Sequence, residues 1–141
     1  MADKKIRLRV LTPVGTKFDD DIDMVIFRCT NGDMGVLPDH EARSAALDYG
    51  IMRIIENKEE RWLAIYGGIA EILDNVVTVV TNDAEWPEDI NAEHAEAIRE
   101  QVQQRLREKQ DDVEIQRDEV LLRRLLVQLE ICSYDGRCSG E

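Results

Sequence analysis

The densest cluster of chemically capable side chains in this chain is a run of aspartates. Asp19, Asp20, Asp21 and Asp23 are close enough in sequence to suggest a calcium site. An EF-hand loop, however, needs a glycine at its sharp turn and a glutamate as its last ligand. This run has neither at the required spacing, so it predicts an exposed, solvated loop and no metal site.

The histidines and cysteines do not form a catalytic group either. His40 has no nucleophile at a suitable spacing, and nucleophilic catalysis needs such a pair. We therefore interpret His40 as a surface or structural residue and predict no catalytic residue. Cys29, Cys132 and Cys138 lack framework spacing, which is typical of free thiols in a reducing compartment. The alternative is a disulfide or a metal site at Cys132 and Cys138, although two thiolates without a histidine make an incomplete zinc site.

Three arginines stand out on an otherwise acidic chain: Arg117, Arg123 and Arg124. Residues 117 and 124 are seven apart and therefore share one face of a helix. Two interpretations stay open. These side chains are solvated and pair locally, as Glu114 with Arg117 or Glu119 with Arg123, at tenths of a kcal/mol each, or they form a basic stripe that meets an acidic partner segment.

Composition limits the class of protein. The 141 residues carry a formal net charge of −12 and are 43% hydrophobic, which provides one modest core and excludes a disordered chain. The acidity is even, because residues 1–87 carry 10 basic and 16 acidic side chains and residues 88–141 carry 8 and 14. Nucleic acid is a poor partner, since its binding depends on clustered Lys and Arg that neutralise phosphate.

Membrane and export signals are also missing from the pattern. No segment approaches the roughly 20 apolar residues that a membrane-spanning helix needs. The first ten residues are interrupted by charges at Asp3, Lys4, Lys5, Arg7 and Arg9, so they lack the apolar segment of a signal peptide. The sequence predicts a cytosolic protein.

The chain changes character at Pro87, and before it the pattern is that of short strands. Residues 6–10 alternate apolar and basic side chains, and the run 24–29 ends at the turn signal Asn31-Gly32. The runs 51–55 and 62–66, and the runs 69–72 and 76–80, are spaced as two hairpins. We expect Gly67-Gly68 to be a tight turn between strands. Six or more strands without an intervening helix predict an antiparallel β-sandwich.

After Pro87 the pattern is that of two helices. Asn91 is a suitable N-cap, and the first helix has a stripe of Ala95, Ile98, Val102 and Leu106. After the link 109–112, in which Asp111 or Asp112 can cap the next helix, the second stripe consists of Leu122, Leu125, Leu126 and Leu129, widened by Val113, Val120 and Leu121. Gly136 ends the helix, and we expect residues 135–141 to be a loose tail.

The predicted fold class is therefore α+β, mainly β. An N-terminal antiparallel β-sandwich at residues 1–86 is followed by an antiparallel two-helix hairpin at residues 87–141. Isolated helices of this length depend on tertiary contacts for stability. We expect the hairpin to dock in one state and to open in another.

Three segments resemble a known family. The segment 31–40, NGDMGVLPDH, resembles the Gly-x-x-Gly-[Ile/Val]-Leu-Pro-x-His signature of the epsilon subunit of bacterial F-type ATP synthase. The segment 49–54 looks like the strand that follows it, and the segment 67–72 resembles the Gly-Gly-x-x-Glu-[Val/Ile] element. The order and spacing of these segments are specific, and the match covers roughly residues 5 to 131.

The resemblance implies a non-catalytic rotor subunit in the central stalk of a proton- or sodium-translocating ATP synthase. In that family the sandwich lies against the gamma subunit and the membrane rotor ring of c subunits, which implies that Asp33 lies in the ring-facing loop and His40 near gamma. The hairpin can extend toward the alpha and beta subunits of the catalytic head and inhibit ATP hydrolysis. Arg117, Arg123 and Arg124 fit that contact. The implied location is peripheral, on the cytoplasmic face of the cell membrane.

The chain departs from the family at the nucleotide-binding element of the hairpin. ATP-binding members carry Ile-Asp-x-x-Arg-Ala, and the matching residues here are Ile90, Asn91, His94 and Ala95. Arg124 is kept on the second helix, but Gln128 stands where ATP-binding members often have arginine. A histidine is smaller and mostly neutral at pH 7, unlike the arginine fork. We therefore predict weak or absent ATP binding and no cofactor.

The rotor subunit has two alternatives of a different class. One is a regulatory module that senses ATP by binding it on the folded hairpin, which the changes at Asn91 and His94 argue against. The other is a small hydrolase on a β scaffold, for which the strands carry no paired acid–base or metal cluster. His94 could add pH sensitivity, although a plain helix-surface histidine is the favoured interpretation.

Overall fold

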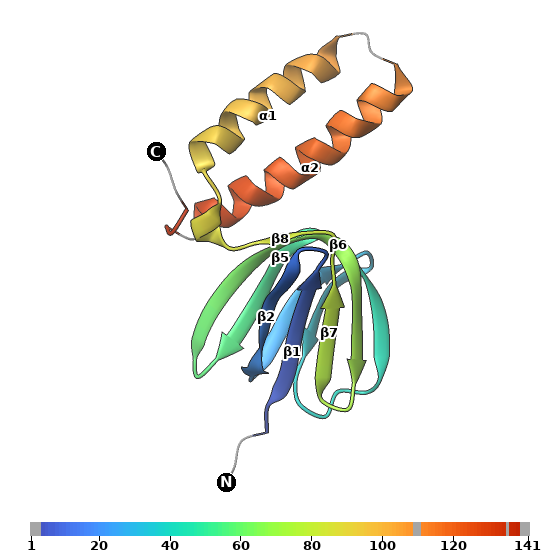
Figure 1. Ribbon diagram of the computed structural model, residues 1–141, viewed down its shortest axis with the longest axis vertical. Coiled ribbons are helices and arrows are strands. Elements are labelled where there is room, and N and C mark those ends of the chain that lie inside the picture. The colour runs from blue at the N-terminus through green and yellow to red at the C-terminus, as the bar shows by residue number, and fades with distance from the viewer. Residues whose placement is uncertain (1–3, 109–110, 135, 139–141) are drawn as a thin grey trace. The chain divides into compact units, whose positions relative to one another are not determined.

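The computed structural model describes residues 4–108, 111–134 and 136–138 (Figure 1). The chain divides into two compact units, Met1–Glu85 and Trp86–Glu141, which are called the β unit and the helical unit below. The first contains a β-sandwich and the second a pair of helices, which confirms the predicted α+β fold class.

The β unit is built from eight strands of one sheet. They are β1 (Ile6–Thr12), β2 (Gly15–Ile22), β3 (Met24–Cys29), β4 (Gly32–Val36), β5 (Arg43–Glu56), β6 (Glu59–Leu73), β7 (Val76–Val80) and β8 (Ala84–Glu85). Their order is β2-β1-β7-β6-β5-β3-β4, and β8 pairs with β6. The pairs are antiparallel except for β1 with β7, which is parallel. The expected sandwich is thus mostly antiparallel.

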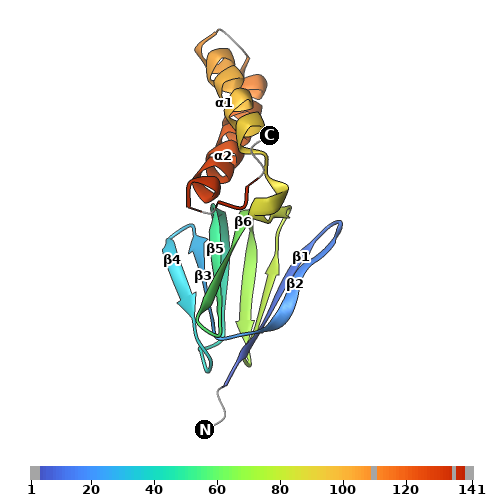
Figure 2. The same cartoon turned by 90° about the vertical axis from the view of Figure 1, so that its left-hand side faces the viewer.

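The long strands β5 and β6 fold this sheet into two layers. They pair from Arg43↔Ile72 to Glu56↔Glu59, and the register steps from Leu47↔Gly68 to Tyr49↔Tyr66. Beyond that step β6 pairs with β7, and before it with β8. The β3–β4 and β1–β2 hairpins consequently lie on opposite sides of the unit (Figure 2).

The core lies between the two layers and follows the period-2 pattern of the strands. In β1, Ile6, Leu8 and Val10 are at most 1% exposed, whereas Arg7 and Arg9 between them point to solvent. The same alternation buries Val77 and Val79 in the neighbouring strand. Each such side chain contributes roughly 1.5–3 kcal/mol when it leaves water.

The expectation of a loop at the aspartate run is wrong. Residues 19–22 lie in β2, an edge strand, and Asp23 follows it directly. Arg7 pairs opposite Asp21, and its Nε lies 2.7 Å from Asp19 Oδ1. Charges of opposite sign facing each other stabilise a strand pair, and an acidic edge resists pairing with a second chain. These contacts offset the low strand propensity of aspartate.

The expectation of a tight turn at Gly67-Gly68 is also wrong. Both glycines lie inside β6, so the two strands predicted at 62–66 and 69–72 are one strand with a bend. Their φ angles are +79° and +135°, a region that side chains other than glycine rarely adopt. A pair of glycines therefore marks a corner of the sandwich here and not a reversal of the chain.

The helical unit contains the turn η1 (Pro87–Asp89) and the helices α1 (Ala92–Arg107) and α2 (Asp112–Tyr134). Both predicted caps are confirmed. The Oδ1 atom of Asn91 accepts a bond from the amide of His94 at 2.9 Å, and that of Asp111 accepts one from the amide of Glu114 at 2.8 Å. Such caps satisfy donors that a helix leaves unpaired at its start.

The two helices share a small apolar core. Its buried members and the partly buried side chains packed against them are Ala95, Val102, Leu125, Ile98, Leu106, Leu121, Leu122 and Leu129. The first predicted stripe is thus confirmed. The second is wrong at Leu126, which is 45% exposed, and at Val113 and Val120, which are 65% and 43% exposed, because the 3.6-residue period turns these positions away from α1.

An ion pair joins the helices beside this core. Arg105 of α1 donates from Nε and Nη2 to the two carboxylate oxygens of Asp118 in α2, at 3.1 and 3.0 Å. Asp118 is 6% exposed. The two-bond geometry fixes orientation as well as distance, so this pair sets the register of the helices near their connection.

The prediction of free thiols is wrong for two of the three cysteines. Cys132 and Cys138 form a disulfide, and Cys29 is free and buried. Helix α2 ends at Tyr134, and the turn around Gly136 brings Cys138 back toward the last turns of the helix. Residues 136–138 are therefore tied to α2 rather than loose, while Asp135 and residues 139–141 lie outside the described residues.

Among the residues that the structure describes, neither helix has an apolar segment long enough to cross a membrane.

Replacing Gly68 by alanine tests the bend. The added Cβ would clash with the carbonyl oxygen of Val80 and lie 2.9 Å from Thr81 Cα. We expect Gly68→Ala to lower the free energy of unfolding by more than about 2 kcal/mol, measured by urea unfolding and circular dichroism. Gly15→Ala is the matched control, since Gly15 has a φ of +137° and no atom within 4 Å of its added Cβ. Equal losses in both variants would contradict a packing role for Gly68.

Candidate functional site

The family signature spans β4 and the loop after it, and it carries the first two candidate contact residues. Asp33 lies in β4, opposite Arg28 of β3, with Arg28 Nε 3.7 Å from Asp33 Oδ1. It is exposed and lies within the strand rather than in the adjoining loop. Arg28 also packs over Gly50, where an added Cβ would lie 2.9 Å from Arg28 Cβ. Asp33 is thus an exposed charge on a fixed strand.

His40 lies in the connection between β4 and β5. The neighbouring Asp39 has a φ of +67°, and its amide donates to Asn75 Oδ1 at 2.6 Å. Its carboxylate accepts bonds from Lys4 Nζ at 2.8 Å and from Asn75 Nδ2 at 3.4 Å. The bonds from Lys4 and then Asn75 lower the pKa of Asp39. These contacts fix the His40 loop to the turn between β6 and β7.

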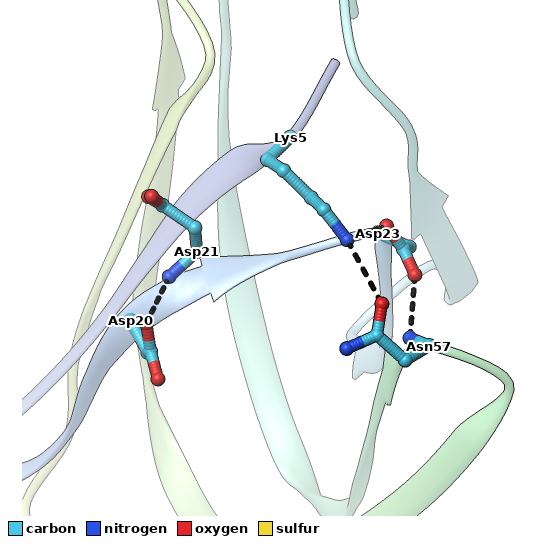
Figure 3. Close-up of polar contacts among 5 residues, drawn as sticks. All are labelled: Lys5, Asp20, Asp21, Asp23 and Asn57. Carbon is cyan, nitrogen blue, oxygen red and sulfur yellow. Dashed lines mark hydrogen bonds and ion pairs between the residues drawn. The ribbon is translucent and has the colours of Figure 1, made fainter. Parts of the chain in front are cut away.

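A second polar clamp, shown in Figure 3, lies at the same end of the β unit, where β1 begins. Lys5 Nζ lies 2.5 Å from Asp23 Oδ1, and the amide of Asn57 donates to Asp23 Oδ2 at 2.7 Å. Lys5 also reaches Asn57 Oδ1 at 3.5 Å. The clamp joins the start of β1, the β2–β3 corner and the β5–β6 turn. The clamp is not evident from the sequence, because Asp23 and Asn57 are 34 residues apart.

The candidate contact residues of the β unit are not brought together. Asp33 is the second residue of β4, next to the β3–β4 turn, whereas His40 follows the opposite end of that strand. Nδ1 of His40 lies 2.7 Å from the carbonyl oxygen of Glu41. The two residues therefore lie at opposite ends of β4.

The candidate arginines of the helical unit lie on α2. Arg117 and Arg123 are exposed and Arg124 is partly exposed. Positions 113, 117, 120 and 124 follow each other at three- or four-residue steps, so Val113 and Val120 share a face with Arg117 and Arg124. The apolar side chains that the sequence assigned to the helix core thus lie beside the basic groups, on a face that is apolar as well as charged.

The positions that correspond to the nucleotide-binding element serve the helix itself. Ile90 is 2% exposed, Ala95 belongs to the core between the helices, and the carboxamide of Asn91 caps α1. His94 is exposed. Ala95 shares its cluster with Leu125, the neighbour of Arg124. Within the described part of the chain, no three His, Cys, Asp or Glu side chains are placed to hold a metal ion.

Comparison with known proteins identifies the family. Residues 5–87 match the family model described as "ATP synthase, Delta/Epsilon chain, beta-sandwich domain". The chain belongs to this family. Its similarity to the epsilon chains extends beyond the sandwich, because the ATP synthase epsilon chain of Bacillus velezensis is 34% identical over 128 residues, which cover 91% of this chain and 97% of that relative.

Other relatives agree with this assignment. The ATP synthase epsilon chain of Prochlorococcus marinus is 40% identical over 106 residues, covering 75% of this chain and 78% of the relative. A chain in the cryo-EM structure of Euglena gracilis mitochondrial ATP synthase, OSCP/F1/c-ring, has a TM-score of 0.81 at 23% identity, over 92% of this chain and 81% of that one. A chain of the Tetrahymena thermophila central stalk and c-ring has a TM-score of 0.59 at 12% identity, over 93% and 98%. These two structures share the fold.

The Lys5–Asp23–Asn57 clamp predicts a loss of stability in acid. Hydrogen bonds from Lys5 and then from the Asn57 amide lower the pKa of Asp23. A carboxylate with a lowered pKa stabilises the fold above its unfolded pKa of about 3.9, and this stability is lost as the pH falls through the folded pKa. We expect the free energy of unfolding to decrease below about pH 5 and the decrease to be smaller in Asp23→Asn.

Urea unfolding across this pH range provides the measurement. Asp20→Asn is the matched control, because Asp20 lies on the exposed edge strand and accepts a bond from the adjacent amide of Asp21 (Figure 3). It should keep the slope of the native chain. An unchanged slope in Asp23→Asn would show that the clamp contributes nothing to the pH dependence.

Proposed function

We propose that this chain is the non-catalytic epsilon subunit of a proton- or sodium-translocating F-type ATP synthase. It acts as part of the rotor in the central stalk, couples rotation to ATP synthesis and ion transport, and inhibits ATP hydrolysis. The single observation that carries the proposal is the match of the sandwich to the family model, extended over most of the chain by relatives named ATP synthase epsilon chain.

The two parts of the chain receive different tasks in this proposal. Residues 1–86 bind the gamma subunit and the membrane rotor ring of c subunits, with His40 near gamma and Asp33 toward the ring. The attachment of the His40 loop to Asn75 through Asp39 supports this, since a loop that is held by hydrogen bonds deforms less when torque passes through its contact. The subunit is peripheral, on the cytoplasmic face of the membrane.

Residues 87–141 form the regulatory part in this proposal. In its extended state the hairpin contacts the alpha and beta subunits of the catalytic head, and Arg117, Arg123 and Arg124 pair with acidic segments there. The exposed Val113 and Val120 beside the arginines support this assignment. Protein interfaces combine apolar side chains with arginine, and apolar side chains are less favourable when they stay exposed to water.

A structural use of polar groups supports a non-catalytic role. Asp23, Asp39 and Asp118 each hold a neighbouring segment through a lysine, an asparagine or an arginine. The ATP-sensing alternative has less support, because the side chain that replaces the family's aspartate, that of Asn91, is engaged in capping α1.

Alanine substitution of the arginines tests the inhibitory contact. In the complete enzyme reconstituted with the full chain, we expect Arg117→Ala and Arg124→Ala each to weaken the inhibition of ATP hydrolysis by about two- to five-fold, the effect of removing one partly exposed ion pair. The measurement is the hydrolysis rate against the concentration of the added chain.

Arg107→Ala is the matched control, because Arg107 is an exposed arginine on α1. It should leave the inhibition unchanged. If all three variants inhibit like the native chain, the arginines of α2 do not form the contact. If the native chain neither binds the stalk nor affects hydrolysis, the proposed function itself is wrong.

A further inference from the structure

The end of α2 carries a covalent link that the proposed function does not use. Cys132, in the last turns of α2, is bonded to Cys138, six residues later, with 5.5 Å between their Cα atoms. Both residues are partly exposed, and a Cβ added at Gly136 in the intervening turn would meet no atom within 4 Å. Small thiols therefore have access to the bond.

We propose that Cys132 and Cys138 form a reversible thiol–disulfide site that decides how firmly the C-terminal end of α2 is held. The inference concerns the helical unit alone and does not depend on the proposed function. In the oxidised state the bond acts as a covalent cap on the helix, and in the reduced state the last turn of α2 is released.

The end of α2 has a particular need for such a cap. A helix leaves its last four carbonyl groups unpaired, and basic side chains in the last turn stabilise the negative end of its dipole. The last turn of α2 contains no basic residue. The hydroxyl of Ser133 donates to the carbonyl oxygen of Glu130 at 2.7 Å, one residue before these last four carbonyl groups. The disulfide is the described contact that ties the chain beyond the helix back to it.

The disulfide lies close to the last buried side chains of α2. Val127 and Ile131 are the last buried side chains of α2, at 6% and 0% exposure. The same part of the unit includes the turn η1, which contacts α2. Fraying of α2 from its C-terminal end would reach Ile131 before Val127, so the oxidation state of Cys132 bears on whether the side chain of Ile131 stays buried.

The third cysteine of the chain does not compete with the pair. Cys29 is 7% exposed, and burial raises the pKa of its thiol. The described free thiol of the chain is thus a poor competitor for exchange with the pair.

The exchange is balanced with a small thiol as co-reactant. A glutathione thiolate attacks one sulfur of the pair, the Cys132–Cys138 bond breaks, and the other cysteine leaves as a thiol after protonation. A second glutathione thiolate then attacks the mixed disulfide, giving two protein thiols and one molecule of oxidised glutathione. Two electrons pass from glutathione to the protein, and the reverse sequence reforms the bond.

Hydrogen exchange on the full chain tests the proposal. The chain is equilibrated in glutathione buffers of different ratios, the mass of the intact chain reports the loss or gain of two hydrogen atoms, and amide exchange is measured over residues 127–134. We expect complete, reversible conversion and roughly tenfold faster exchange in the reduced state. Cys29→Ser should respond in the same way.

Cys138→Ser removes the disulfide and keeps the sequence of α2 unchanged, because residue 138 lies outside the helix. It should exchange like the reduced native chain in every buffer. The proposal is overturned if oxidised and reduced chains exchange equally over residues 127–134, if Cys138→Ser keeps the slow exchange of the oxidised chain, or if the bond does not form at any glutathione ratio.

Discussion

The bend in the paired strands β5 and β6 is the constraint on which the rest of the β unit depends. One sheet of eight strands can enclose a core only if it folds over, and here the fold is made inside two strands rather than between them. At the bend Gly68 lies against the backbone of Val80 and Thr81, where a side chain has no room. The exchange of β6 partners from β8 to β7 occurs at the same place.

The bend also decides which segments meet at the far end of the unit. Because β5 and β6 each run up one layer and return down the other, the start of β5 and the end of β6 reach the same end as the β5–β6 turn (Figure 1). The two clamps, Lys4–Asp39–Asn75 and Lys5–Asp23–Asn57, join segments that are distant in sequence. The first of these clamps holds the loop that carries His40 against the turn between β6 and β7.

The layout of the fold was predictable from sequence where one period dominated. The alternation of Ile6, Leu8 and Val10 predicted β1, and the caps at Asn91 and Asp111 predicted the helix starts. The strand at 15–22 was not predictable from propensity, since Asp19 and Asp21 are stabilised there by Arg7 on another strand. Such a contact between two strands produces no periodic pattern within the sequence of either strand.

The candidate site was predictable only through family resemblance. The side chains that surround its residues are known from the structure alone. The motif residues Asp33 and His40 were found from sequence, whereas the partners of Asp39 were not, because Lys4 and Asn75 lie 35 and 36 residues away. The spacing of the leucines places Leu126 in the apolar stripe of the second helix, although the helix turns this side chain outward. The disulfide of Cys132 and Cys138 is not predictable from cysteine spacing alone, because spacing does not reveal that a helix end and a turn bring the two thiols together.

The central claim is that the β unit attaches the subunit and that the helical unit restrains hydrolysis. The most direct measurement is ATP hydrolysis by the cognate catalytic head, stripped of this chain and supplied with either the full chain or a version that ends at Pro87. The account predicts that both bind and that only the full chain inhibits. Equal inhibition by the two, or binding of both without any inhibition, would contradict it.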